Sequence, residues 1–186
     1  MKNLLLTFVL FFITTLNIHG QTIENLDIKR GFKDFTLGDA LSKWGTELEY
    51  KSRIDENTFS FTYVGDCCAK VFEYDVDDIT LRFSNKVLVG IDIKTKKIQK
   101  EYTVSGKYTK FTTDHLDNVK SSLSYLFGEP SLYNVQESDA TFYYSWIGKE
   151  VILILTYQYL GVSGGDLLII NVIDLEYFNK DIENGF

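Results

Sequence analysis

The chain has 186 residues and a net charge of −7 at neutral pH. This acidic balance disfavours nucleic acid and anionic lipid as partners, because lysine and arginine drive the binding of phosphate groups. The chain contains two histidines, which excludes a zinc site built from several of them, and a histidine-dependent triad would have to use His115.

The first twenty residues have the pattern of a signal peptide. Lys2 supplies the positive start, an apolar run covers residues 4–16, and Gly20 offers a small residue before a predicted cut ahead of Gln21. The apolar run is short for a membrane span, so an uncleaved anchor is the less favoured alternative. The sequence therefore predicts an exported protein, periplasmic or extracellular, with no stable membrane insertion after the leader is removed.

The first half of the mature chain is predicted to contain a short helix followed by strands. Leu37, Leu41 and Trp44 recur at helical spacing, which predicts a helix within residues 32–44 that ends at Gly45. Apolar and polar residues then alternate, as expected for strands with one buried face. The strand patterns cover residues 59–63, 69–74, 79–84 and 87–94, with a hairpin turn at 85–86.

These strands predict a sheet with one polar, solvent-facing side. The polar side is formed by Thr62, Thr80, Arg82, Asp92 and Lys94, and the core side by Ile79, Leu81, Phe83, Val89 and Ile91. Arg82, Asp92 and Lys94 are candidate partner-binding residues. Arg82 is the expected anchor, since arginine combines planar hydrogen bonding with stacking. We therefore expect Arg82→Ala to weaken partner binding while leaving the melting temperature nearly unchanged.

The second half begins with the clearest helix of the sequence. An apolar stripe runs from Leu116 to Leu126, and Gly128 and Pro130 end the helix. Strand patterns follow in residues 141–146, 150–159 and 166–173, and residues 174–181 predict a short terminal helix or a frayed end. Because residues 151–155 are apolar on both faces, something must cover the outer side of this sheet: the first unit, the terminal segment or another protein.

The two halves echo each other weakly, which predicts an architecture built by doubling. The best-matching stretches are residues 72–81 and residues 144–153. The expected fold class is α+β, with two related units over residues 21–100 and 101–186 after the leader of residues 1–20. Each unit is expected to be a short helix followed by an antiparallel sheet of three to four strands.

Two features of the sequence come nearest to a known chemical motif: a pair of adjacent cysteines and a cluster of aspartates. Neighbouring side chains of a strand point to opposite faces, so Cys67 and Cys68 are not expected to bridge each other. A strained vicinal bridge and an intermolecular bond are the alternatives. Asp75, Asp77 and Asp78 lack the glycine and terminal glutamate of a calcium loop, which favours a solvated acidic turn. The sequence predicts no catalytic residue, no metal site and no cofactor.

An aromatic row occupies residues 141–146. Alternation places Phe142, Tyr144 and Trp146 on one face of the predicted strand and Tyr143 on the other. Aromatic side chains left outside a core make good anchors for a partner protein, so Tyr143 and Trp146 are candidate partner-binding residues. The alternative is that the row belongs to the core.

The segment Phe32–Gly38, followed by Leu41 and Trp44-Gly45, resembles the start of repeats in the β-lactamase-inhibitor-protein-like and BamE-like group. The segment Phe127–Pro130 resembles the same helix end in a second copy. The resemblance implies an exported protein that binds other proteins through a sheet surface and has no catalytic residues. It places no family binding residue in this chain.

The leading hypothesis is an exported, non-catalytic protein that binds another protein or acts in envelope assembly. A small-ligand or carbohydrate-binding domain is the alternative, suggested by 12 tyrosines and 2 tryptophans, and a carboxylate-dependent hydrolase is less favoured. A broad exposed sheet would support the first hypothesis. A deep pocket lined by tryptophan and tyrosine would support the second, and two carboxyl groups facing each other in a cleft would support the third.

Overall fold

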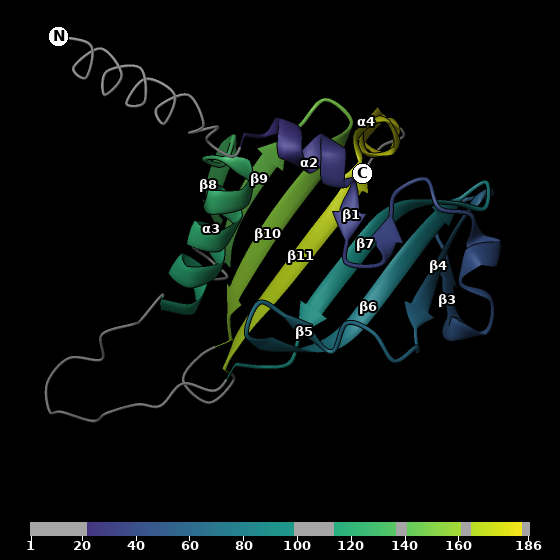
Figure 1. Ribbon diagram of the computed structural model, residues 1–186, viewed down its shortest axis with the longest axis horizontal. Helices are drawn as coiled ribbons and strands as arrows, with labels where there is room; N and C mark the ends of the chain where they lie inside the picture. The colour runs from purple at the N-terminus through teal and green to yellow at the C-terminus, as the bar shows by residue number, and fades with distance from the viewer. Residues whose placement is uncertain (1–21, 99–113, 137–140, 161–164, 184–186) are drawn as a thin grey trace, which may run out of the picture.

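An antiparallel sheet of nine strands dominates the computed structural model, which describes residues 22–98, 114–136, 141–160 and 165–183 (Figure 1). The strands lie side by side in the order β3 (Leu48–Arg53), β4 (Thr58–Tyr63), β6 (Tyr74–Ser84), β7 (Val87–Thr95), β11 (Asp166–Asp174), β10 (Val151–Tyr159), β9 (Thr141–Ile147) and β8 (Leu132–Gln136). The ninth, β5 (Lys70–Val71), pairs with the beginning of β6. The expected leader and its cut before Gln21 lie outside the described residues.

Both halves of the chain contribute to this one sheet, so the predicted fold of two helix-plus-sheet units is wrong, and the protein is mostly antiparallel β-sheet. The halves join where β7 pairs with β11, from Gly90 opposite Ile173 to Lys94 opposite Ile169. Either strand left at an edge would expose unpaired backbone N–H and C=O groups, and the pairing satisfies them. It also merges the apolar sides of the two halves into one core.

The sequence echo does not correspond to equivalent elements. Residues 72–81 cover the β5–β6 turn and most of β6, whereas residues 144–153 cover the end of β9, a turn and the start of β10. The similarity therefore reflects strand-like composition in both stretches and not a repeated unit.

One face of the sheet carries the main core. Helix α2 (Glu24–Lys29), the hairpin of β1 (Gly31–Phe32) and β2 (Phe35–Thr36), and helix α3 (Asp114–Phe127) lie over this face (Figure 1). Their buried side chains form one cluster with those of the central strands: Leu26, Phe35, Leu116, Val119, Leu123, Leu81, Ile91, Leu155 and Val172. Helix α4 (Leu175–Glu183) lies on the opposite face.

The helix predicted within residues 32–44 is absent. Lys33, Gly38 and Gly45 have φ angles of +50°, +97° and +44°, which interrupt helical geometry. The segment instead forms the β1–β2 hairpin and two short 3₁₀ turns, η1 (Leu41–Lys43) and η2 (Gly45–Glu47). Leu37 and Trp44 are buried as expected, but a hairpin and a turn bring them to the core.

The remaining local predictions agree better with the structure. α3 ends at Phe127, and Gly128 follows it with a φ of +81°, the left-handed position that a glycine best occupies. The predicted strands are present except at residues 69–74, where β5 covers Lys70–Val71 alone and a two-residue turn precedes β6. The terminal segment forms α4. Helix α2 and strands β3 and β8 were not predicted.

The predicted facing of β6 and β7 is correct except at one point. Leu81, Phe83 and Ile91 face the core, while Arg82 and Asp92 lie on the other side. The register shifts between Arg82 and Phe83, so that Phe83 pairs with Leu88. This bulge turns Leu88 into the core and leaves Val89 half-buried, the reverse of what simple alternation predicts.

Helix α2 is fixed to the turn between β9 and β10 through one carboxylate. Asp27 accepts hydrogen bonds from the backbone N–H groups of Lys149, Glu150 and Val151 at 2.7, 2.9 and 3.1 Å. A Cβ atom at Gly148 would lie 2.3 Å from an oxygen of Asp27, which is too close. The contact between the β9–β10 turn and α2 therefore requires glycine at position 148.

In the part of the chain that the structure describes, no helix is long and apolar enough to cross a membrane.

Candidate functional site

The second face of the sheet carries residues from both halves of the chain. Two cross-strand rows run across β9, β10, β11 and β7. One row is Tyr143, Thr156, Ile169 and Lys94, and the next is Ser145, Ile154, Asn171 and Asp92. Lys94 is exposed and the other seven side chains are half-buried. We call these eight residues the open face.

Helix α4 closes one end of the open face. The row beyond Ser145 and Asp92 contains Ile152 and Ile173, which are both buried. Tyr177 of α4 lies close enough to Arg82 and Thr58 for electrostatic interaction with the first and contact with the second. Within the described part of the chain, the terminal segment therefore covers this end of the outer side of the sheet.

Arg82 lies on the predicted side of the sheet but is largely covered. Its side chain is 16% exposed, and its Nη2 donates to Oδ1 of Asp92 at 2.8 Å. The same carboxylate oxygen accepts from Nδ2 of Asn171 at 2.6 Å. The guanidinium lies over Gly90, where a Cβ atom would come within 2.8 Å of Nε. Arg82 thus orients Asp92 and is not a free anchor.

A second polar group lies at the border of the open face on β6. Asp78 accepts from Lys51 at 2.9 Å and from the Thr80 hydroxyl at 2.7 Å, and it is opposite Lys94 in the strand register. Burial opposes ionisation of Asp78, but the hydrogen bonds from Thr80 and Lys51 outweigh it and hold the pKa of Asp78 below its ordinary value. On this side of the sheet Lys51 is thus paired with Asp78, as Arg82 is with Asp92.

The structure brings four of the five predicted partner-binding residues to this side of the sheet: Arg82, Asp92, Lys94 and Tyr143. Trp146 is the exception, because it is 0% exposed and its Nε1 donates to the Gly128 carbonyl at 2.8 Å. The prediction that Trp146 binds a partner is therefore wrong. The row Phe142, Tyr144 and Trp146 points to the core, as the alternative interpretation held.

Cys67 and Cys68 are bridged, so the prediction of two unlinked thiols is wrong. That prediction assumed a strand, but both residues lie in the connection between β4 and β5. A φ of +72° at Cys68 turns the two side chains toward each other. Among the described residues, the group close enough to share a metal ion is Asp34 with these two cysteines, and the bridge leaves it no thiolate ligands.

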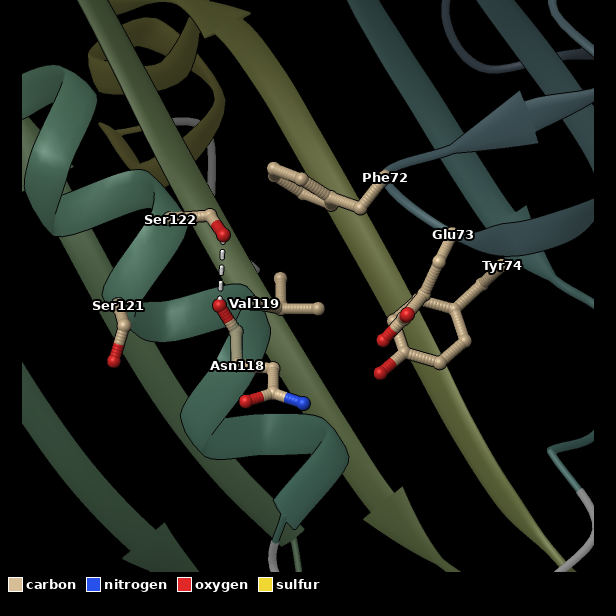
Figure 2. A pocket seen from close by; sticks show the side chains of 7 residues that line it. All are labelled: Phe72, Glu73, Tyr74, Asn118, Val119, Ser121 and Ser122. Atoms are coloured by element: carbon tan, nitrogen blue, oxygen red, sulfur yellow. Dashed lines mark hydrogen bonds between the residues drawn. The ribbon is translucent and has the colours of Figure 1, made fainter.

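A cleft of about 440 Å³ lies on the other face, between the β5–β6 turn and α3 (Figure 2). Phe72, Glu73 and Tyr74 form one wall, and Asn118 and Ser122 of α3 form the other. Sequence analysis missed this cleft, because its two walls are far apart in the chain and neither has a recognisable motif.

Tyr74 connects the two walls of the cleft. Its hydroxyl is 3.1 Å from Nδ1 of His115 in the first turns of α3. Burial and the neighbouring Glu73 carboxylate raise the pKa of Tyr74 well above its ordinary value. The hydroxyl therefore stays protonated and acts as a neutral hydrogen-bonding group.

Comparison with known proteins identified no relative: no protein-family model, no curated protein and no solved structure matches this chain. The resemblance of residues 32–45 to the β-lactamase-inhibitor-protein-like and BamE-like group stays a prediction.

Proposed function

We propose that this chain is an exported, non-catalytic protein of the cell envelope that binds another protein through the open face. One observation carries the proposal: the β7–β11 pairing places candidate binding residues from both halves of the chain on one broad, partly exposed surface. Among the described residues, α4 covers one end of this surface, and the open face beyond it is partly exposed.

The composition of the open face suits a protein partner. Tyr143, Ile154 and Ile169 supply apolar contact area, while Ser145, Thr156 and Asn171 supply hydrogen-bonding groups around them. Protein interfaces that form and dissociate have this mixture of apolar and polar area, with aromatic residues among the strongest contributors. The flat geometry of a sheet matches a protein surface better than it matches a small molecule.

Two competing functions have less support on this face. Trp44 and Trp146 are both buried, so neither offers a ring to a carbohydrate. Asp78 and Asp92 are each held by a cation and a polar neighbour, so they do not form the pair of opposed carboxyl groups that hydrolysis of a glycoside needs.

Site-specific photocrosslinking in envelopes of producing cells tests the proposal. A photoreactive amino acid replaces Tyr143 or Thr156 on the open face, and Tyr125 serves as the matched control because it is 74% exposed on the outer side of α3. We expect one specific protein adduct from positions 143 and 156 and none from 125. No adduct, or the same adducts from all three positions, would contradict the proposal.

The same preparations test export. Intact-mass analysis of the protein recovered from the envelope or the medium should correspond to a chain that starts at Gln21. A mass that includes residues 1–20 would contradict the predicted leader cleavage.

A further inference from the structure

We infer that the cleft between the β5–β6 turn and α3 is a binding site for a neutral pyranose sugar, with Phe72 as the stacking surface and Glu73, Tyr74 and Asn118 as the hydrogen-bonding groups. The site is on the opposite side of the sheet from the open face. A test of sugar binding is therefore independent of a test of the proposed protein partner.

The first argument is the conformation of Phe72. β5 and β6 are joined by a turn of two residues, since Val71 pairs with Tyr74. Phe72, the first turn residue, has a φ of +52°, a position that glycine or asparagine normally takes because side chains are unfavourable there. The residue is nevertheless 42% exposed, and its ring extends toward α3 across the cleft (Figure 2). An exposed aromatic side chain in an unfavourable backbone conformation is the basis for a hypothesis that this turn has a function.

The second argument is the set of polar groups below the ring. Glu73 and the Tyr74 hydroxyl lie on the turn side, and the Asn118 amide extends toward them from α3 (Figure 2). A carboxylate accepts hydrogen bonds from two hydroxyl groups, and an amide both donates and accepts. This combination matches neighbouring hydroxyl groups on a ring.

The third argument is size and shape. A volume of about 440 Å³ lies in the range of ordinary small-molecule sites. Val119, which is buried, contributes apolar lining from α3. The C–H groups on one side of a pyranose carry slight positive charge and pack against the negative face of an aromatic ring, while the hydroxyl groups at the edge reach the polar wall.

Glu73 beside an aromatic ring could also attract an organic cation. The neutral sugar is favoured because the Asn118 amide and the Tyr74 hydroxyl, which also bonds to His115, are uncharged hydrogen-bonding groups that a quaternary ammonium ion cannot use. The two ligand classes separate cleanly in an experiment.

Saturation-transfer NMR and isothermal titration of the full mature chain test the inference. The probes are glucose, galactose and N-acetylglucosamine, with tetramethylammonium as the cationic probe. We expect saturable binding of at least one sugar and none of tetramethylammonium. No saturable sugar binding, or binding of tetramethylammonium alone, would overturn the inference.

Variants locate the site and separate binding from folding. Phe72→Gly should weaken sugar binding at least tenfold without lowering the melting temperature, because glycine relieves the unfavourable φ. Glu73→Gln should weaken binding with the fold unchanged. Tyr125→Ala, which removes an exposed aromatic side chain of α3, is the matched control and should bind as the unmodified chain does. Unchanged affinity in Phe72→Gly and Glu73→Gln would show that the sugar binds elsewhere and would overturn the assignment.

Discussion

At the scale of single residues, Arg82 shows how burial changes the meaning of a charged side chain. Its pairing with Asp92 at 2.8 Å and its 16% exposure replace the sequence-based expectation that its removal leaves the melting temperature unchanged. We expect Arg82→Ala to lower the free energy of unfolding by about 2 kcal/mol, because Asp92 loses its cation in a partly buried site. Urea denaturation measures this loss.

Lys94→Ala is the matched control for Arg82→Ala, since Lys94 lies on the same side of the sheet and is exposed. It should change the free energy of unfolding by less than about 0.5 kcal/mol. Equal denaturation midpoints for the two variants would contradict the role assigned to Arg82.

Asp27 gives a prediction about acid stability. Burial opposes its ionisation, but three backbone N–H hydrogen bonds, from Lys149, Glu150 and Val151, hold the pKa of Asp27 below its ordinary value. A carboxylate whose pKa is lower in the folded than in the unfolded chain stabilises the fold at neutral pH. This stabilisation is lost as the pH falls below about 4 and through the folded-state pKa.

Asp27→Asn should therefore lower stability at pH 7 by about 2 kcal/mol and flatten the loss of stability below pH 4. Thermal unfolding followed across pH 2–7 measures both effects. Asp77→Asn, at an exposed position on β6, is the control and should follow the unmodified chain. If Asp27→Asn lost stability below pH 4 as steeply as the unmodified chain, this carboxylate would be ruled out as a source of acid sensitivity.

The Cys67–Cys68 bridge has a chemical test of its own. The denatured, unreduced chain should resist alkylation, and its cysteine peptide should be two mass units lighter than the reduced form. Because the bridge closes a very short loop, reduction should change the free energy of unfolding by only about 1 kcal/mol. Alkylation of either thiol without a reductant would show that the two cysteines are not linked.

At the scale of elements, α4 depends on a small number of contacts. None of its residues is fully buried, and Tyr177 is the residue that reaches Arg82 and Thr58. The hydroxyls of Tyr177 and Thr58 are both buried, and neither is hydrogen-bonded to a described residue.

We therefore expect Tyr177→Ala to cost about 2 kcal/mol of stability, because its ring no longer packs on the sheet. Tyr177→Phe keeps the ring and should remain within about 0.5 kcal/mol of the unmodified chain. Chemical denaturation distinguishes the two variants. A phenylalanine variant as unstable as the alanine variant would mean that the two hydroxyls are hydrogen-bonded in solution.

The elements that could be predicted from the sequence are those with a strong period. α3 has an apolar stripe and a glycine stop, and β4, β6, β10 and β11 have apolar runs or alternation. The helix predicted within residues 32–44 was wrong because a hairpin and a 3₁₀ turn can bring Leu37, Leu41 and Trp44 to the core as well as a helix can. β8 was missed because four of its five residues are exposed, which leaves no pattern to detect.

At the scale of the whole molecule, the arrangement of strands could not be predicted. Nothing in the local sequence of β7 or β11 specifies that they pair, because the choice of neighbouring strand depends on how all the other strands of the sheet are paired. Alternation predicted the sides of β6 and β7, with Arg82, Asp92 and Lys94 together on the polar side, and on β9 it separated Tyr143 from Trp146 without saying which of them faces the core. Which side becomes the core of β9 depended on α3 and α2, and Trp146 was misassigned for that reason.

The β7–β11 pairing also affects how fast the chain folds. Its two strands are separated in sequence by α3 and by β8, β9 and β10, so the entropy of a long loop is lost before any of these hydrogen bonds form. We expect refolding to take milliseconds to seconds, as in other proteins dominated by non-local strand pairs. Stopped-flow tryptophan fluorescence can follow it, since Trp44 and Trp146 are buried, and refolding complete within microseconds would contradict it. Until the last strand arrives, β7 is an open edge, so the time between synthesis and closure is when this chain most needs protection from other strands.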